Sequence, residues 1–174
     1  MSPTSLPDAV CSIVIKVPVD AVWAEITKTG SIQRPLYNTV LDIDLTPGGR
    51  LRYSSPDRKR VFVAGEVLEV DPPRLLKHTY IFGLKPEAPT VVTWELTEVP
   101  DETRVTLTHA GWTDAHTAPE KQISGWTEIL GLLKSELETG DIPTKMKLIY
   151  WMQGLFMWAM PKTTKATYAD EQGW

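Results

Sequence analysis

Cysteine and long apolar runs are almost absent from this sequence. Cys11 is the only cysteine among 174 residues, which excludes an internal disulfide and a zinc site built from several cysteines, and is typical of a reducing compartment. No run of about 18 consecutive apolar residues occurs, and residues 1–8 lack the basic flank and apolar stretch of a signal peptide. We therefore expect a cytoplasmic protein with no transmembrane span.

An excess of basic residues is missing as well. Eighteen Lys and Arg residues against 22 Asp and Glu residues give a net charge of −4. The field of such a chain repels polyanions, so nucleic acid is not an expected partner. The sequence also lacks the Gly-x-Ser-x-Gly, Gly-x-x-x-x-Gly-Lys and Gly-x-Gly-x-x-Gly motifs, which removes the hydrolase, kinase and dehydrogenase interpretations.

What the sequence does contain is enough apolar material for one core. Hydrophobic residues make up 42% of the chain and seven of them are tryptophans, so burial can offset the backbone entropy that folding costs. A chain of this length can bury roughly 70% of the surface that its unfolded form exposes. We expect one folded domain over residues 10–140, after a flexible N-terminus at residues 1–9.

The N-terminal part of this domain predicts a strand and a helix. Residues 10–17 are rich in β-branched side chains and precede Pro18, which has no N–H to donate to a sheet. Apolar residues then recur at helical spacing over residues 19–26. Residues 31–37 are expected to add a short helix, distorted by Pro35.

Residues 40–111 predict an antiparallel meander, because short β-type runs alternate there with turn residues. Together with the first strand they make a sheet of about seven strands. Residues 83–90, with two prolines, are expected to form a loop at the mouth of any cavity. The six predicted strands are Val40–Leu45, Arg50–Ser54, Val61–Val70, Leu75–Phe82, Val91–Glu98 and Arg104–Ala110.

A long helix is predicted over residues 117–139. Thr117 and Glu120 have the spacing at which both side chains satisfy free backbone N–H groups of a helix start, and Gly140 ends the helix. Gly125 and Gly131 lie inside it, where each costs about 1 kcal/mol relative to alanine. That cost predicts the close approach of a strand backbone, or else of a ligand.

The C-terminal extension, residues 141–174, is unusually apolar. Residues 144–160 can form a helix that is apolar nearly all round before Pro161, followed by a flexible end. Three ways of covering this helix stay open: packing on its own domain, a homodimer contact, or a membrane surface, for which Lys145 and Lys147 are favourable.

The order of these elements resembles the START-like or SRPBCC superfamily, whose curved sheet grips a C-terminal helix. Five segments narrow the resemblance: Val17–Trp23, Pro47–Arg50, Gly65–Leu75, Val92–Leu96 and Thr103–His109. They are similar to the branch named after the activator of the heat-shock-protein-90 ATPase. The resemblance implies an α+β helix-grip fold, and the superfamily includes lipid and hormone carriers, polyketide cyclases and aromatases, and co-chaperone domains.

Candidate ligand contacts follow from the alternation of side chains along strands, which sends every second residue towards the last helix. The resulting wall is apolar, with a few polar groups at the ends of its side chains, as in small-molecule pockets. The same residues could instead fill a core. The candidates are Leu51, Tyr53, Leu76, His78, Tyr80, Trp94, Leu107, His109, Trp126, Leu130 and Leu133.

Two histidines are the strongest candidates for a functional role on this wall. A buried imidazole needs hydrogen-bond partners and titrates near neutral pH, so His78 or His109 could orient a ligand or, with Tyr80, act as an acid or base. Neighbouring Tyr, Thr or backbone groups could equally satisfy both rings. No metal or cofactor is expected, because His109, Asp114 and His116 do not form a recognised ligand pattern.

The leading hypothesis is a non-enzymatic protein that holds a small hydrophobic or aromatic molecule between sheet and helix. One alternative is an enzyme of the cyclase or hydration type that acts on an aromatic or polyketide-like substrate. Another is a protein-interaction module similar to the chaperone-ATPase activator. The sequence names no ligand for any of the three.

Overall fold

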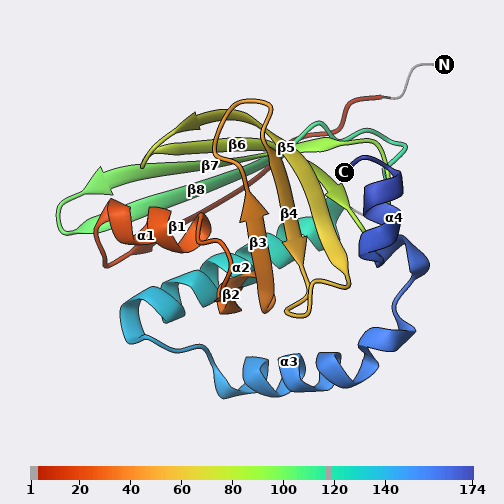
Figure 1. The fold of residues 1–174 in the computed structure, drawn as a ribbon. Coiled ribbons are helices and arrows are strands. Elements are labelled where there is room, and N and C mark those ends of the chain that lie inside the picture. Colours follow the sequence, from red (N-terminus) through yellow and green to blue (C-terminus); the bar gives the residue numbers. More distant parts are fainter. Residues whose placement is uncertain (1–3, 117–118) are drawn as a thin grey trace.

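An eight-stranded antiparallel sheet forms the framework of the protein (Figure 1). The computed structural model describes the backbone of residues 4–116 and 119–174, and all of their side chains except those of residues 119–123. The strands lie in the order β1-β8-β7-β6-β5-β4-β3-β2. They are β1 (Ala9–Ile15), β2 (Ile32–Gln33), β3 (Thr39–Ile43), β4 (Arg50–Ser54), β5 (Val61–Asp71), β6 (Leu75–Phe82), β7 (Thr90–Val99) and β8 (Glu102–Ala110).

This architecture confirms the predicted α+β helix-grip fold, with one strand more than expected. The additional strand is β2, which has only two residues and pairs with β3. The short helix expected over residues 31–37 is reduced to a 3-10 turn at Arg34–Leu36. Pro35 explains this, because proline fits the first turn of a helix but cannot extend it.

Irregular pairing along β5 gives the sheet its curvature. Its register against β6 shifts between Val67 and Glu69, and its register against β4 shifts opposite Tyr53 and Ser54. Such bulges bend a strand and increase its twist. Gly65 is required at this bend, because any side chain there would collide with the backbone carbonyl of Thr79.

Within the described part of the chain, four α-helices accompany the sheet. The long helix α2 crosses the concave side, as predicted, and α1 packs beside the end of β7 and β8 (Figure 1). The predicted cap of α2 involves Thr117, which lies outside the described residues. The helices are α1 (Val19–Ile26), α2 (Pro119–Thr139), α3 (Thr144–Phe156) and α4 (Ala166–Glu171).

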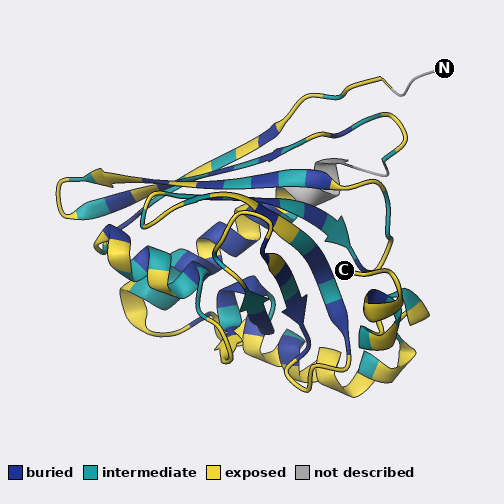
Figure 2. Ribbon diagram, turned by 45° about the horizontal axis from the view of Figure 1, so that its top comes forward, coloured by how far each residue is buried: buried dark blue, intermediate teal, exposed yellow. Residues whose placement is uncertain are grey.

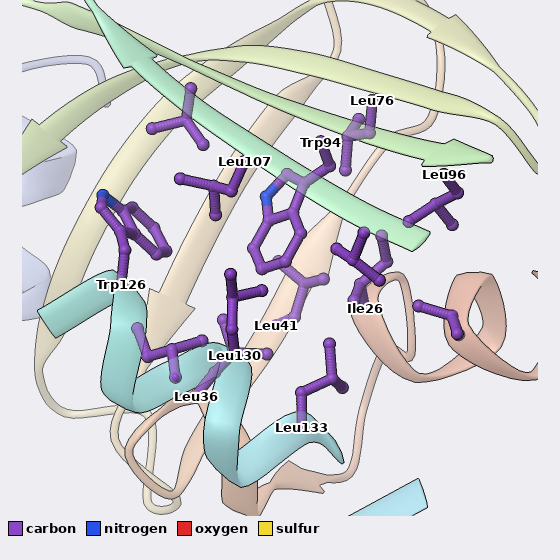
Figure 3. Packing of buried hydrophobic residues seen from close by; sticks show 14 of the residues in the cluster. Ile26, Leu36, Leu41, Leu76, Trp94, Leu96, Leu107, Trp126, Leu130 and Leu133 are labelled. Carbon is purple, nitrogen blue, oxygen red and sulfur yellow. The ribbon is translucent and has the colours of Figure 1, made fainter. Parts of the chain in front are cut away.

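The core between the sheet and α2 is densely packed at one end. Trp94 and Leu107 point from β7 and β8 towards Leu130 and Leu133 of α2, and Ile26 of α1 closes the cluster (Figure 3). All five side chains are almost completely buried. Burying each large apolar side chain contributes about 1.5–3 kcal/mol to folding, so this cluster is a main source of stability.

The extension folds back along the domain instead of ending freely. Helix α3 ends at Phe156, and a 3-10 turn continues to Ala159. The segment predicted as a helix over residues 144–160 is therefore α-helical up to Phe156 and 3-10 in its last turn. The prediction of a flexible C-terminal end was wrong, because α4 packs on β5, with Ala169 fully buried against Val61 and Ala64. The small side chains of Ala64 and Ala169 allow this close contact.

The N-terminus is also less free than expected. Residues 4–6 run beside the loop after β8, where the Leu6 N–H donates to the carbonyl of Trp112 and the Thr4 N–H donates to Asp114. Backbone hydrogen bonds of this kind were not visible as a sequence pattern.

Candidate functional site

A cavity of about 650 Å³ lies between the curved sheet, the N-terminal half of α2 and helix α3. Its volume falls within the roughly 300–1,000 Å³ of typical small-molecule sites. The wall combines strand residues, the loop of residues 83–90, α2 and α3. Its principal lining residues are Tyr37, Asn38, Tyr53, Phe62, Val63, Tyr80, Phe82, Leu84, Lys85, Glu87, Ala88, Trp112, His116, Trp126, Ile129, Tyr150, Gln153, Gly154, Met157 and Met160.

Strand alternation places the apolar part of this wall. Tyr53 of β4, Val63 of β5, and Tyr80 and Phe82 of β6 all point to the concave side and line the cavity. The rings of Tyr80 and Phe82 lie nearly parallel, with centroids 6.4 Å apart. A wall of this composition favours flat, apolar molecules, which gain free energy by leaving water and by stacking on aromatic rings.

Two phenol hydroxyls supply polar points on that wall. Tyr53 and Tyr80 are less than a tenth exposed, and among the described residues neither hydroxyl has a protein hydrogen-bond partner. Burial raises the pKa of both phenols above their ordinary value, so both stay protonated at neutral pH. Each can therefore donate a hydrogen bond to a carbonyl or hydroxyl oxygen inside the cavity.

The backbone is strained where the chain passes from η1 (Arg34–Leu36) to β3. Tyr37 and Asn38 are both left-handed, with φ values of 54° and 61°, and both line the cavity. Asparagine tolerates this conformation, whereas tyrosine rarely adopts it. The Tyr37 hydroxyl is held by Glu128 of α2 at 2.8 Å, and this bond helps to fix the strained turn at the cavity edge.

Helix α3 closes the cavity on the side away from the sheet. Tyr150, Gln153, Gly154 and Met157 face inward from it. Its middle is fastened by the Tyr150 hydroxyl, which donates to the carbonyl of Arg34 at 2.8 Å. The sequence predicted the helix but not which side of it faces the cavity, because a helix that is apolar on all sides does not indicate which side is buried.

Arg60 of the sheet fastens the chain after α3. Its buried guanidinium donates to the carbonyl oxygens of Met160 and Pro161, at 3.3 and 3.1 Å, and to the Thr164 hydroxyl at 3.0 Å. A second nitrogen lies 3.4 Å from the carbonyl of Trp158. These bonds fix the segment that follows α3 and its 3-10 turn.

His109 lies behind the cavity wall, in a saturated hydrogen-bond network. The Trp126 indole N–H donates to its Nδ1 at 2.9 Å, and its Nε2 lies 2.7 Å from the Thr90 hydroxyl. Because an indole can only donate, Nε2 carries the proton and donates to Thr90, whose hydroxyl in turn donates to the Tyr80 carbonyl. Burial, with smaller effects from His78 and His116, lowers the pKa of His109 to about 3.

His78 is buried in the filled part of the core. Its Nδ1 lies 2.7 Å from the carbonyl of Thr79, so Nδ1 donates and Nε2 keeps its lone pair. That Nε2 atom is buried without a hydrogen-bond partner among the described residues. Burial lowers the pKa of His78 to about 4, and the ring is neutral at pH 7.

The eleven predicted contact residues are thus divided between two places. Tyr53, Tyr80 and Trp126 line the cavity. The other eight are buried and do not line the cavity: Leu51, Leu76, His78, Trp94, Leu107, His109, Leu130 and Leu133. Alternation correctly identified the inward side but not which part of it faces empty space.

The position of the loop at residues 83–90 was predicted correctly. Leu84, Lys85, Glu87 and Ala88 line the cavity, and His116 reaches the same loop, with its Nε2 at 3.1 Å from the carbonyl of Ala88. The close approach of a strand backbone predicted at the glycines of α2 was wrong, whereas the approach of a ligand stays a prediction at Gly125, which lines the cavity. A side chain at Gly125 would meet only the Tyr37 hydroxyl, at an ordinary 3.6 Å, and one at Gly131 would meet nothing.

Comparison with solved structures supports the fold. DynU16, a protein in the dynemicin biosynthetic locus, is 24% identical with a TM-score of 0.64, covering 78% of this chain and 48% of its own; this chain thus spans about half its length. CalU16 from Micromonospora echinospora is 24% identical with a TM-score of 0.59, covering 90% of this chain and 92% of its own. At such identities the likeness shows the fold alone.

A third neighbour is the Aha1 dimer from Colwellia psychrerythraea, which is 18% identical with a TM-score of 0.63 and covers 78% of this chain and 99% of its own. A search of curated proteins finds no match. The family model of the activator of Hsp90 ATPase homolog 1-like proteins matches residues 16–138, well over half of the chain. The protein therefore belongs to the activator of Hsp90 ATPase homolog 1-like family.

Proposed function

We propose that this protein binds a small hydrophobic or aromatic molecule in the cavity between the sheet, α2 and α3. The observation that carries the proposal is an apolar cavity of about 650 Å³ into which two buried phenols project without protein partners. Each hydroxyl can donate a hydrogen bond into the cavity. A bound molecule with a carbonyl or hydroxyl oxygen would accept these bonds in place of water.

The wall also restricts the shape of the molecule. Tyr80 and Trp126 meet edge to face with centroids 5.9 Å apart, and both line the cavity. Aromatic walls of this kind favour planar ring systems over branched aliphatic chains. We therefore expect an aromatic or polycyclic molecule with one or two oxygen acceptors placed near Tyr53 and Tyr80.

The cyclase or hydration alternative has less support. The two histidines considered as acid or base lie behind the cavity wall, and burial lowers the pKa of both. Tyr80 lines the cavity, but its raised pKa keeps it protonated, which suits it to donating a hydrogen bond rather than to accepting a proton.

A chaperone-activator function is supported by the family alone. The matching model is named for a homologue of the Hsp90 ATPase activator. In this alternative the protein acts as an interaction module and the cavity plays no part. Purified components would separate the two functions: stimulation of the chaperone's ATP hydrolysis that survives filling of the cavity would favour the interaction module.

The direct test is a ligand screen by thermal shift and native mass spectrometry, with flavonoids, polyketide-like aromatics and fatty acids as probes. Gly154 lines the cavity with open space in front of it, and Gly131 lies on the exposed side of α2 with equally open space. Gly154→Phe should weaken binding of any hit at least about tenfold, because its ring occupies ligand volume.

Gly131→Phe is the matched control, since it adds the same ring to a helix outside the cavity. It should leave the affinity unchanged. Equal affinity of both variants for every hit, or no shift with any probe, would refute ligand binding in this cavity.

A further inference from the structure

The outer face of α3 and the turn after it form an exposed apolar surface. Trp158 is 77% exposed, Trp151 is 64% exposed and Phe156 is 63% exposed, and Figure 2 shows this segment as mostly exposed at the edge of the molecule. Aromatic side chains are rarely left in water at such a density. The α3 outer face consists of Leu148, Trp151, Met152, Leu155, Phe156 and Trp158.

Helical spacing separates this face from the cavity face. Leu148, Trp151, Met152 and Leu155 follow one another at intervals of three, one and three residues, which puts them on one side of the helix. The residues that line the cavity alternate with them along the chain and lie on the opposite side. The exposed side chains therefore cannot turn inward without emptying the cavity wall.

Charge around this face has one sign. Residues 142–169 contain four lysines and no acidic residue. Because the whole chain has a net charge of −4, the remaining residues carry −8. Two lysines precede the apolar stretch and two follow it: Lys145, Lys147, Lys162 and Lys165.

Three of these lysines are available to a partner of opposite charge. All four are exposed. Lys147 pairs with Asp141, just outside the segment, at 2.5 Å, while Lys145, Lys162 and Lys165 form no ion pair among the described residues. Lys145 precedes Leu148 by three positions and Met152 by seven, so it shares their side of the helix.

We propose that the α3 outer face docks on the surface of an anionic lipid bilayer. Tryptophan, phenylalanine and leucine on one side of a helix, with flanking lysines, are what an interfacial helix needs: the rings enter the headgroup region and the ammonium groups meet lipid phosphates. The thirteen residues of α3 span about 20 Å, less than the roughly 30 Å of a bilayer core.

The helix therefore lies on a bilayer and does not cross it. Among the described residues, no helix is long and apolar enough to span a membrane. The two attachments of this segment favour docking, because Arg60 and Tyr150 hold the exposed rings in place before binding. Little conformational entropy is then lost on contact.

A second copy of the chain fits this face less well. An isologous contact would bring the two sets of four lysines close to each other, and like charges at an interface cost free energy. An anionic surface gains from the three lysines without an ion pair, at about tenfold in affinity for each one or two lysines.

Docking would also place the bilayer one helix away from the cavity, because the inner side of α3 forms part of its wall. An apolar molecule dissolved in the bilayer could then reach the cavity without crossing water. This link rests on the proposed function, whereas bilayer binding itself can be measured without any ligand.

The test is flotation of the purified full chain with two kinds of vesicle: phosphatidylcholine alone, and equal parts of phosphatidylcholine and phosphatidylglycerol. We expect binding to the anionic vesicles that weakens with added salt. Trp151→Ser with Trp158→Ser should reduce it at least about tenfold, as should Lys145→Gln with Lys162→Gln and Lys165→Gln.

The controls are Val10→Ser, which removes another exposed apolar side chain on β1, and Lys16→Gln, which removes a charge beyond the segment. Both should bind like the original protein. All substituted side chains are exposed, so the variants should keep their circular dichroism spectrum and melting temperature.

Two outcomes would overturn the proposal. One is the absence of binding to anionic vesicles. The other is a dimer, seen by analytical ultracentrifugation, that the double tryptophan variant dissociates, since the face would then belong to a second copy. Ligand binding in the cavity could survive either outcome, so failure of docking is distinguishable from failure of the proposed function.

Discussion

The two ends of the concave side have the same strand alternation but different contents. At the α1 end, Trp94, Leu107 and Leu133 pack together and are almost completely buried (Figure 3). At the α3 end, Tyr53, Tyr80 and Ile129 face a cavity of about 650 Å³. An inward-facing side chain is therefore a core residue or a wall residue according to what lies opposite it.

The helices that cover each end explain the difference. Helix α1 brings Val22 and Ile26 into the core, where both are fully buried. Helix α3 is attached through residues up to its middle, where Met146 and Tyr150 are buried with Leu132, and none of residues 151–160 is buried. It crosses in front of the cavity without filling it.

Trp126 marks the boundary between the two ends. Its ring meets Trp94 of the filled end and Tyr80 of the hollow end, each with centroids 5.9 Å apart, and its N–H donates to His109. A single side chain thus contributes both to packing and to the cavity wall.

The largest expected effect comes from truncating two side chains of α2, one at the filled end and one at the hollow end of the concave side. Leu133 and Ile129 are one turn apart, but Leu133 lies in the packed end and Ile129 lines the cavity. Leu133→Ala should reduce the free energy of unfolding by about 4 kcal/mol, because a new void adds to the lost transfer energy. Ile129→Ala should cost only about 2 kcal/mol, since the space beside it is already empty.

Urea unfolding of both variants measures this difference. Leucine and isoleucine differ in helix propensity by only a few tenths of a kcal/mol, less than the expected difference of about 2 kcal/mol, so each variant controls for the other. Equal losses would mean that the hollow end is as tightly packed as the filled one in solution.

The sequence was sufficient to predict the sheet. The bounds predicted for β4 and β6 are those observed, because turn residues flank clear β-type runs on both sides. Strand β2 was missed because two residues carry no periodicity; only its pairing with β3 defines it.

The site could be predicted only in part. Alternation placed Tyr53, Tyr80 and Trp126 on the concave side, and they line the cavity. It placed Trp94 and His109 there too, but neither lines the cavity. Trp94 packs in the core because of the position of α1, and His109 is held behind the wall by the hydrogen bond from the Trp126 indole. The path of α3 decides where the space remains, and it depends on distant anchors such as Arg60 that leave no local pattern.

Acidification should act mainly through two buried histidines. Burial lowers the pKa of His78 to about 4 and of His109 to about 3, below the unfolded value of about 6.5. The unfolded chain therefore binds more protons, and stability is present above pH 6.5 and lost as the pH falls. Between pH 7 and pH 5, each histidine should remove about 2 kcal/mol from the free energy of unfolding.

Urea titrations at the two pH values test this expectation. His109→Gln should shrink the loss between pH 7 and pH 5 by about half. Surface carboxylates contribute little in this range, because Asp57 and Glu138 have lowered pKa values and titrate at more acidic pH. A protein equally stable at both pH values would show that neither histidine is kept neutral by burial.

The smallest effect concerns hydroxyl groups at the cavity wall. The Tyr150 hydroxyl donates to the carbonyl of Arg34, so Tyr150→Phe should cost about 1 kcal/mol of unfolding free energy. Tyr53→Phe and Tyr80→Phe should each change it by less than about 0.5 kcal/mol, because neither hydroxyl loses a protein partner. Both should nevertheless weaken a bound oxygen-bearing ligand. If either one destabilises the empty protein as much as Tyr150→Phe does, its hydroxyl is already bonded within the folded chain and cannot be a free contact for a ligand.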